Sequence, residues 1–309
     1  MDIHAAIGEY LGNKQNSVTH GTYVWYSFFL RLFDGWVTEQ GITDLAQVTP
    51  VHVQQFVSAS PTQNTYTRHA RAQIVKGFLA WCAQDEEMGV REKTVKRIEL
   101  PKVEQSDLEL FTDEEILKLF RACDKTKHPH RNRAILHVLL DTGIRASELA
   151  YDGDRPEEET GLKMEHVILG RGDESFIRVM GKGRKPRTIG IGNETRLALQ
   201  RYLNRERGRS ACPYVFLAQG NEKPLSVKRL GEMLSVLGDH AGVANVYPHR
   251  FRHTFAVNQL LAGTSALVLM QLMGHTSLEA TKIYTRAMSE LQARKAAPSV
   301  VDQMKRHHR

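Results

Sequence analysis

Cysteine is scarce in this chain of 309 residues, and long hydrophobic runs are missing. The three cysteines, Cys82, Cys123 and Cys212, are odd in number and far apart in the sequence. This spacing argues against a disulfide framework and a zinc cluster, and it predicts reduced thiols in a cytoplasmic protein. The most aromatic stretch, Tyr23 to Phe33, is interrupted by polar residues, so it is too short and too polar to span a bilayer.

Other signals are also absent. The first residues lack a basic segment followed by an apolar one, so no signal peptide is expected. No internal repeat or low-complexity tract stands out, and no carboxylate cluster suggests a metal site. The hydrophobic content of 41% and the charged content of 25% are typical of a soluble globular protein. The length allows one or two domains, each with its own core.

Acidic residues are fewer than basic ones, and the basic excess is confined to one part of the chain. The formal net charge is +7. Residues 1–106 contain 10 Lys and Arg against 11 Asp and Glu, whereas residues 107–309 contain 32 against 24. A basic excess attracts polyanions, of which nucleic acid is the commonest. The second part of the chain is therefore the better candidate for a nucleic-acid partner.

Apolar residues at helical spacing predict a mainly helical first hundred residues. We expect helices over residues 17–40 and 62–83, and a helix that begins with Thr49 as the N-cap and Pro50 at its first position. Core packing is the favoured interpretation of the larger apolar side chains, and for the aromatic ones a base-stacking surface is the alternative. These side chains are Val24, Phe28, Leu32, Trp36, Ile74, Phe78 and Trp81.

Residues 91–107 lose this periodicity and contain Pro101, so they are the candidate linker. A capping box from Thr112 to Glu115 then begins a second domain. Two strands, residues 176–180 and 187–191, are predicted to flank a hairpin turn. Helices are expected at about residues 113–123, 131–141, 193–206, 226–241, 249–262 and 265–273, and after a capping box from Thr276 to Glu279.

The second part also carries six residues suited to phosphate chemistry. Two arginines can clamp a phosphate through forked hydrogen bonds, and a tyrosine close to that clamp can attack it. The set predicts cleavage of a DNA strand through a covalent phosphotyrosine. Its members are Arg145, Lys182, His249, Arg252, His275 and Tyr284.

The order of these residues resembles that of the tyrosine recombinases, the phage integrase and Xer-like family. The motifs are an arginine box around Arg145, a Gly-Lys-Gly hairpin at Lys182, an H-x-x-R pair, a Gly-His pair, and the tyrosine nine residues later. Each motif alone is weak, but the ordered set is specific. The resemblance covers residues 108–290 closely and the first hundred residues more loosely.

The resemblance implies a role for each member of the set. Arg145 and Arg252 would hold the nonbridging oxygens of the phosphate, and Tyr284 would attack the phosphorus. Lys182, favoured over the neighbouring Lys185, would donate a proton to the leaving 5′ oxygen. His275 would support the scissile phosphate, and His249 would donate to a nonbridging oxygen or assist proton transfer. Glu148 would support Arg145 from behind, and a plain surface ion pair is the alternative for this glutamate.

Contacts with DNA are expected elsewhere in the chain as well. In the hairpin, Arg184, Lys185 and Arg187 are candidates for the DNA backbone, and a solvated turn is the alternative. On the helix of residues 62–83, Arg68 and Arg71 are further candidates. One segment departs from the family pattern, because an acidic stretch at residues 150–160 follows the arginine box. A tolerated surface insertion is its favoured interpretation, and a regulatory role is the alternative. Because DNA would repel it, the stretch should point away from the duplex or contact another protomer.

The expected fold is mainly α-helical with a small antiparallel β-sheet, arranged as a two-domain clamp on DNA. A helical core-binding domain of SAM-like type would span residues 1–104, and the catalytic domain residues 108–290. A basic tail, residues 291–309, would dock on a neighbouring subunit or be disordered. The family implies a tetramer on two DNA sites, double-stranded DNA with a specific site as the partner, no membrane partner and no cofactor, with arginines in the place of Mg²⁺.

Two rival functions remain open from the sequence. A type IB topoisomerase-like enzyme would share the site chemistry but rejoin the same strand. A non-catalytic protein on the same scaffold would bind DNA without cutting it. The intact set of six residues favours the recombinase, which would cut and rejoin strands in integration, excision or resolution.

Overall fold

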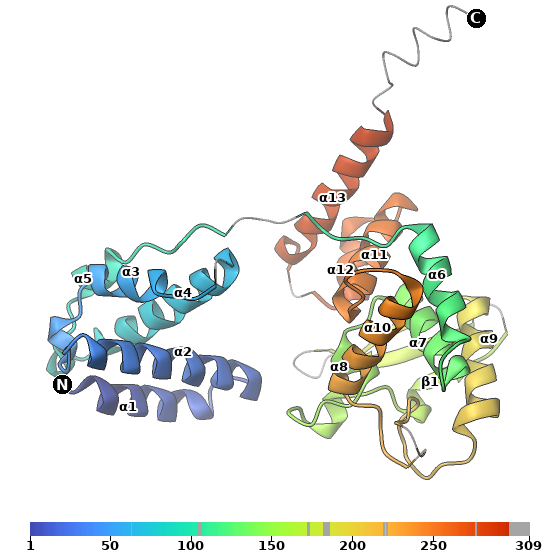
Figure 1. The fold of residues 1–309 in the computed structure, drawn as a ribbon, viewed down its shortest axis with the longest axis horizontal. Helices are drawn as coiled ribbons and strands as arrows, with labels where there is room; N and C mark the ends of the chain where they lie inside the picture. The colour runs from blue at the N-terminus through green and yellow to red at the C-terminus, as the bar shows by residue number, and fades with distance from the viewer. Residues whose placement is uncertain are drawn as a thin grey trace, which may run out of the picture. The chain divides into compact units, whose positions relative to one another are not determined.

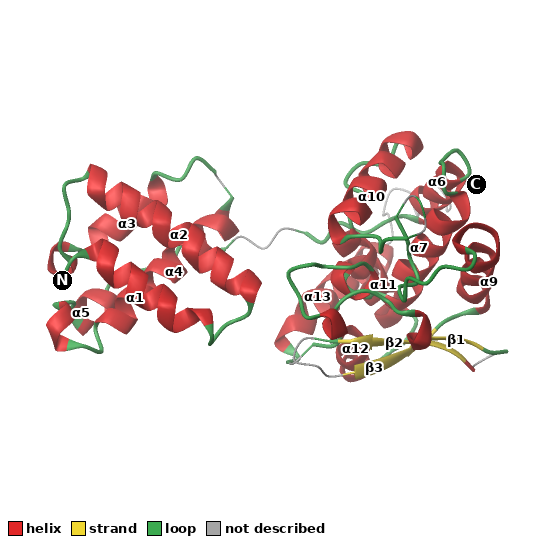
Figure 2. Ribbon diagram, turned by 90° about the horizontal axis from the view of Figure 1, so that it is seen from below, coloured by secondary structure: helices red, strands yellow, loops and turns green. Residues whose placement is uncertain are grey.

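The computed structural model describes residues 1–62, 64–103, 107–171, 174–181, 186–218, 220, 222–275 and 277–296. The fold is mainly helical with one small antiparallel sheet, which confirms the predicted fold class (Figures 1 and 2). The chain divides into two compact units, Met1–Ser106 and Asp107–Arg309. Each unit has its own hydrophobic core, so each is described by itself.

The first unit is a cluster of helices. They are α1 (Ile3–Gln15), α2 (His20–Glu39), α3 (Pro50–Ser58), α4 (Thr65–Cys82) and the short α5 (Glu92–Lys96), with 3₁₀ turns at Leu45–Gln47 and Glu86–Met88. Helix α3 begins as predicted, because the Thr49 side chain accepts a hydrogen bond from the His52 backbone and Pro50 occupies the first turn. The expected burial of Ile74 and Phe78 on α4 is also confirmed.

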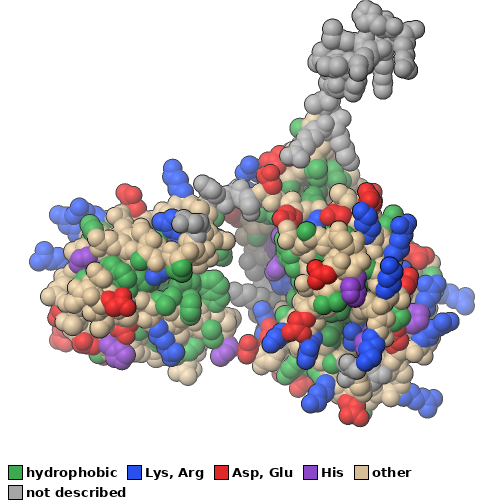
Figure 3. All heavy atoms as spheres, viewed as in Figure 1, with side chains coloured by type: hydrophobic (Ala, Val, Ile, Leu, Met, Phe, Trp, Pro, Cys, Tyr) green, Lys and Arg blue, Asp and Glu red, His purple; other side chains and the backbone are tan. Residues whose placement is uncertain are grey.

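The prediction for the buried face of α2 is wrong. Val24, Phe28 and Leu32 are 48%, 57% and 42% exposed. The face that enters the core is instead formed by Phe29, Leu30, Phe33 and Val37. Helix α2 is apolar on more than one side, so spacing alone did not decide which stripe is buried. Hydrophobic side chains accordingly gather on the face of this unit shown in Figure 3.

The candidate linker begins as an ordered part of the first unit. It contains α5, and Ile98 beyond α5 is buried. The Lys76 ammonium donates a hydrogen bond to the Ile98 carbonyl at 2.6 Å, and His69 Nδ1 lies 2.7 Å from the Pro101 carbonyl oxygen. The segment is therefore held against α4 as far as Pro101.

The second unit begins at the predicted capping box, in which Thr112 and Glu115 bond reciprocally. Its helices are α6 (Asp113–Cys123), α7 (Pro129–Thr142), α8 (Ala146–Leu149), α9 (Asn193–Tyr202), α10 (Val227–Ala241), α11 (Pro248–Leu261), α12 (Ala266–Met273) and α13 (Glu279–Ala296), with 3₁₀ turns at Glu157–Glu159 and Met164–His166 and a π-helical turn at Leu203–Arg207. The predicted Thr276 cap lies outside the described residues, as does the tail from residue 297.

The sheet has three antiparallel strands in the order β1 (Val167–Leu169), β2 (Ser175–Met180) and β3 (Pro186–Gly190). The register pairs Val179 with Arg187. Strands β2 and β3 match the two predicted strands, whereas β1 was not predicted. In Figure 2 the sheet lies at one edge of the unit, beside α12, which contacts β3. This contact places β3 against the helix that ends before His275.

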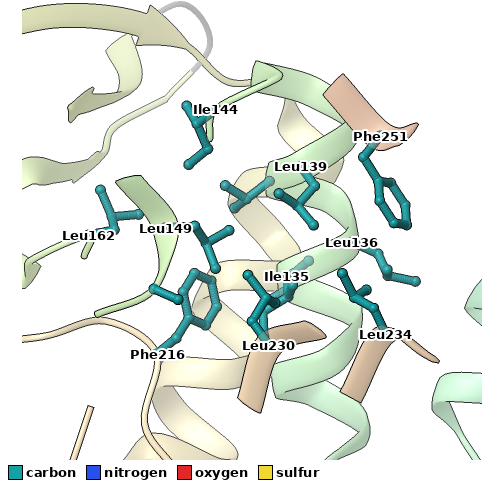
Figure 4. Packing of buried hydrophobic residues seen from close by; sticks show 14 of the residues in the cluster. Ile135, Leu136, Leu139, Ile144, Leu149, Leu162, Phe216, Leu230, Leu234 and Phe251 are labelled. Atoms are coloured by element: carbon teal, nitrogen blue, oxygen red, sulfur yellow. The ribbon is translucent and has the colours of Figure 1, made fainter. Parts of the chain in front are cut away.

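The core of the second unit is centred on α7, whose buried side chains are shown in Figure 4. Ile135 and Leu139 lie among side chains from α8, α10 and α11, including Leu149, Leu230 and Phe251. The arginine-box segment and the H-x-x-R helix are thus fixed to the same core. Among the described residues, no helix is both long and apolar enough to cross a membrane.

Candidate active site

The arginine box begins at a sharp turn between α7 and α8. Gly143 ends α7 in the left-handed conformation, with φ of 57°, and a Cβ atom there would collide with the Phe255 ring. Glycine therefore allows α7 and α11 to approach closely at this point. Ile144 is buried, and Arg145 occupies the N-cap of α8 with its side chain 28% exposed.

Glu148 is the ionic centre of the site, and its side chain is only 3% exposed. Its carboxylate accepts hydrogen bonds from the Arg145 backbone at 2.7 Å and the Arg145 guanidinium at 3.1 Å. Arg187 adds a forked pair, with 2.8 Å from each terminal nitrogen to a carboxylate oxygen. Burial alone would raise the pKa of Glu148, but Arg187 and Arg145 hold it below its ordinary value of 4.5. The carboxylate is charged at neutral pH.

Arg187 joins β3 to the end of α12. Its Nε donates to the Leu272 carbonyl at 2.8 Å, and its side chain is 11% exposed. Gly274 adopts a φ of 62°, which favours glycine, and its backbone lies close to this guanidinium. A Cβ atom at this position would lie only 3.0 Å from Arg187 Nη1. The Arg187 guanidinium is thus committed to protein partners on two sides.

Arg252 is buried in the centre of the site. It donates to the Gly143 and Met273 carbonyls at 2.6 Å each, and to His275 Nε2 at 3.1 Å. Burial, together with the nearby Arg145 charge, lowers the pKa of Arg252 to about 10, so the guanidinium keeps its charge at neutral pH. Arg145 approaches the same place, because its Nη2 donates to the Gly274 carbonyl at 3.2 Å. Two cationic groups converge where α12 ends.

His275 is held by hydrogen bonds to both ring nitrogens. A guanidinium can only donate, so Nε2 accepts from Arg252 and must be unprotonated. The proton then lies on Nδ1, which faces Thr281 Oγ1 at 3.0 Å. Burial and the charges of Arg252, Arg145 and Arg187 lower the pKa of His275 to about 4. His275 is a neutral imidazole of defined tautomer.

Tyr284 lies on α13 with 4% of its surface exposed. Its ring stacks on that of His275, with centroids 6.1 Å apart and an interplanar angle of 12°. Burial raises the pKa of Tyr284, whereas the charges of Arg252 and Arg145 and a hydrogen bond from Arg252 act in the opposite direction. Since the net shift is upward, the resting side chain is a protonated phenol.

His249 lies in the first turn of α11, on the same face as Arg252 three residues later. Its side chain is exposed, unlike that of Arg252. Partial desolvation and the charges of Arg252 and Arg145 lower the pKa of His249. The neighbouring Arg250 points away from the site, because it binds Glu115 at 2.9 Å.

Five of the six predicted site residues are therefore brought together, namely Arg145, His249, Arg252, His275 and Tyr284. The sixth, Lys182, lies outside the described residues, and so do Arg184 and Lys185. In the first unit, Arg71 is buried with its guanidinium 3.8 Å above the Phe56 ring, whereas Arg68 is half-buried on the same helix.

One residue at the site was passed over in the sequence. His253 follows Arg252, and its Nδ1 lies 3.3 Å from the Tyr284 hydroxyl. Its position four residues after His249 was the available signal, because this spacing places both rings on one face of α11. The two rings are stacked with centroids 6.1 Å apart.

The acidic stretch at residues 150–160 leaves the arginine box intact. The backbone N–H groups of Tyr151 and Gly161 donate hydrogen bonds to the carbonyls of Leu225 and Ser147, respectively. Thr160, near the end of the loop, is buried. Within the loop, Arg155 pairs with Asp152 at 3.0 Å. The loop is therefore a local insertion, and the backbone at both of its ends is hydrogen-bonded to the rest of the unit.

Comparison with known proteins agrees with this geometry. A family model described as the phage integrase family matches residues 109–290. Tyrosine recombinase XerD of Mycobacterium tuberculosis is 30% identical over 293 residues, with 88% of each chain covered. Tyrosine recombinase XerC of Bacillus licheniformis is 29% identical over 295 residues, covering 92% of this chain and 91% of the relative.

Solved structures share the fold at lower identity. The XerH site-specific recombinase bound to palindromic difH substrate, in a post-cleavage complex, aligns with a TM-score of 0.71 at 22% identity, covering 89% of this chain and 79% of that one. A lambda integrase dimer bound to a COC′ core site aligns with a TM-score of 0.71 at 15% identity, covering 92% and 95%. The motif order, the converged site and the family match together show that this chain belongs to the phage integrase family of tyrosine recombinases.

Proposed function

We propose that this enzyme performs site-specific recombination of DNA with Tyr284 as its nucleophile. The observation that carries the proposal is the convergence of Arg145, Arg252 and His275 on the Tyr284 phenol. A phosphate beside the phenol would lie next to two guanidinium groups. Because these groups are already held in place, their positive charge would stabilise the negative charge of the transition state without any rearrangement of the side chains. His249, on the exposed edge of the cluster, is available to bind a nonbridging oxygen.

The reaction follows as two transesterifications. The Tyr284 oxygen attacks phosphorus, forms a 3′-phosphotyrosine and releases a 5′ hydroxyl. A 5′ hydroxyl from the partner duplex then attacks the phosphotyrosine and restores a phosphodiester. The energy of the bond is kept in the covalent link, so neither step needs ATP. By family resemblance Lys182 protonates the leaving 5′ oxygen.

The five candidate DNA-binding residues divide into two proposed roles. Arg68, Arg184 and Lys185 remain candidates for DNA contact. Arg187 and Arg71 are better explained as structural groups, because Arg187 binds buried Glu148 and Arg71 stacks on Phe56. A phosphate would have to compete with Glu148 for the Arg187 guanidinium, and Arg71 is only 7% exposed.

We further propose the larger assembly that the family implies. A helical core-binding domain of residues 1–104 and a catalytic domain of residues 108–290 would close as a clamp on the duplex. Four copies would act on two DNA sites in the cytoplasm, with the basic tail, residues 291–309, docked on a neighbouring subunit. The basic excess of residues 107–309 supports the assignment of DNA as the partner.

Binding to DNA should weaken steeply as salt is added. If the clamp neutralises six or more phosphates, the dissociation constant should rise by roughly 10³-fold or more between 50 and 200 mM salt. Gel-shift titrations of a duplex at several salt concentrations measure this slope. A flat response would contradict the clamp.

Strand exchange is the direct test of the proposed function. A plasmid carrying two copies of the DNA that flanks the gene of this protein would be incubated with the enzyme, and its junctions sequenced. Recombination gives new junctions between the two copies. Relaxation of supercoils without new junctions would favour the topoisomerase-like rival, and tight binding without either change would favour the non-catalytic one.

A further inference from the structure

Attack by Tyr284 requires that the phenol lose its proton, and the family motif leaves open which side chain receives it. Two histidines, His253 and His275, lie beside the phenol ring, and His249 stacks on the far side of His253. Each neutral imidazole has one nitrogen with a free lone pair, so each is a chemically possible acceptor. Their hydrogen bonds distinguish them.

His275 is unsuited to this role in the observed arrangement. The lone pair on its Nε2 accepts from Arg252 at 3.1 Å, and its protonated Nδ1 faces Thr281. It meets Tyr284 through stacked ring faces and not through a ring nitrogen. His275 can therefore hold the phenol ring and Arg252 in place, but it has no lone pair to offer the phenolic proton.

His253 is the histidine that meets the reacting oxygen. Its Nδ1 lies 3.3 Å from the Tyr284 hydroxyl, and its ring is half-buried between His249 and Tyr284. Tyr284 is a protonated phenol, because burial raises its pKa. When the proton of the neutral His253 ring lies on Nε2, Nδ1 has a free lone pair and accepts the hydrogen bond that the phenol donates.

We propose that His253 is a catalytic residue, whose Nδ1 binds the phenolic proton of Tyr284 and takes it as the bond to phosphorus forms. This inference rests on the proposed role of Tyr284 as the nucleophile.

The proton and the bonds balance in this step. The O–H bond of Tyr284 breaks, its oxygen bonds to phosphorus, and the bond from phosphorus to the 5′ oxygen breaks. The phenolic proton passes to His253 Nδ1, giving an imidazolium, while the leaving oxygen takes a proton from the separate donor on its own side. In the second transesterification the attacking 5′ hydroxyl gives its proton to the group that protonated the leaving oxygen in the first step, and its oxygen bonds to phosphorus. The bond from phosphorus to the Tyr284 oxygen breaks, and the imidazolium returns its proton to that oxygen.

The charges around His253 make this transfer dependent on DNA. Burial, with His249 and the Arg252 charge, lowers the pKa of His253 to about 4, and burial raises the pKa of Tyr284. The proton therefore stays on the phenol in the free enzyme. A bound phosphate brings negative charge beside Arg252 and Arg145, which favours the imidazolium and offsets the cationic surroundings. The nucleophile is thus kept inactive until a scissile phosphate is in place.

Substitutions of His253 separate proton transfer from positioning. In His253→Asn, the side-chain amide places a polar atom near the position of Nδ1 but cannot take a proton. In His253→Ala, both the hydrogen bond and the base are lost, and added imidazole can enter the space. His240→Ala removes an exposed histidine of α10 and is the matched control. The assay is the single-turnover rate of covalent complex formation on a nicked duplex, with DNA binding measured in parallel.

We expect His253→Ala and His253→Asn both to slow covalent complex formation by about 10²-fold or more at unchanged DNA affinity. Imidazole should restore part of the rate to His253→Ala alone, and His240→Ala should match the wild type. If His253→Ala fails to fold, His253→Asn decides the matter, because it keeps a polar side chain of similar reach.

Two outcomes would overturn the assignment in different ways. A Tyr284-dependent complex formed by His253→Asn at the wild-type rate would show that the ring only positions the phenol, and would leave the proposed function standing. A covalent complex that persists in Tyr284→Phe would overturn the proposed nucleophile, and the role of His253 with it.

Discussion

Tyr284→Phe should abolish the covalent protein–DNA complex while DNA is still bound with close to wild-type affinity. The substitution removes only the attacking oxygen, so we expect the rate of strand cleavage to fall by at least roughly 10⁴-fold. The ring would remain stacked on His275 and buried against α11 and α12. Loss of the hydroxyl hydrogen bonds should cost about 1 kcal/mol of stability, too little to unfold the unit.

The measurement uses nicked duplexes from DNA flanking the gene, which trap the intermediate because the released end diffuses away. Denaturing gels then show the covalent complex as a shifted band. Tyr247→Phe is the matched control, because Tyr247 is a nearby tyrosine that is 39% exposed, at the N-cap of α11. If the band survived in Tyr284→Phe, or were lost in Tyr247→Phe, the assignment of Tyr284 as the nucleophile would be wrong.

The grouping of five of the six candidate site residues could be predicted from the sequence because the motifs that contain them are short and local. The i, i+3 spacing of His249 and Arg252 places both on one face of α11, and the Gly-His pair marks the end of α12. The order of the motifs along the chain supplied the rest. Burial and tautomer could not be predicted in this way, because they depend on partners far away in the sequence.

The partners of Arg187 could not be predicted from the spacing of residues in the sequence. In the sequence it is one of several basic residues around a hairpin, which suggests contact with DNA. In the structure it pairs with Glu148, 39 positions earlier, and with the Leu272 carbonyl, 85 positions later. Only the packing of β3 against α12 brings these groups together.

Helix α2 shows the corresponding limit for the fold. Its existence and extent followed from periodicity, but the orientation of its apolar faces did not. Both the stripe of Val24, Phe28 and Leu32 and the stripe that contains Phe29 and Phe33 satisfy helical spacing. The contacts with α1 and α4 select the second stripe, and these contacts are properties of the folded unit.

Glu148→Gln should destabilise the second unit and leave the first unit unaffected. The nearly fully buried carboxylate accepts hydrogen bonds from two guanidinium groups. In glutamine, the side-chain NH₂ group would face guanidinium N–H groups, so that donors would face donors. Breaking a buried ionic contact of this kind costs about 3–5 kcal/mol, because the remaining charges stay buried without their partner. Arg145 would also lose the contact that orients it, so strand cleavage should fall together with stability.

The distribution of tryptophan allows the two units to be followed separately in one chain. All three tryptophans, Trp25, Trp36 and Trp81, lie in the first unit. In urea unfolding of the full chain, tryptophan fluorescence should keep its wild-type midpoint, whereas the circular dichroism signal should show an earlier transition of the second unit. Glu114→Gln is the control, because Glu114 is exposed and pairs with Lys118, which is also exposed, so its loss should leave both signals unchanged.

The dependence of this effect on pH follows from the direction of the pKa shift. Folding holds the pKa of Glu148 below its ordinary value of 4.5, so its contribution is complete above that pH and is lost as the pH falls through the lower folded value. The difference in stability between the wild type and Glu148→Gln should therefore be constant at neutral pH and shrink only in acid. If the difference instead shrank near neutral pH, Glu148 would be protonated in the folded enzyme, and the ionic centre assigned to the site would be wrong.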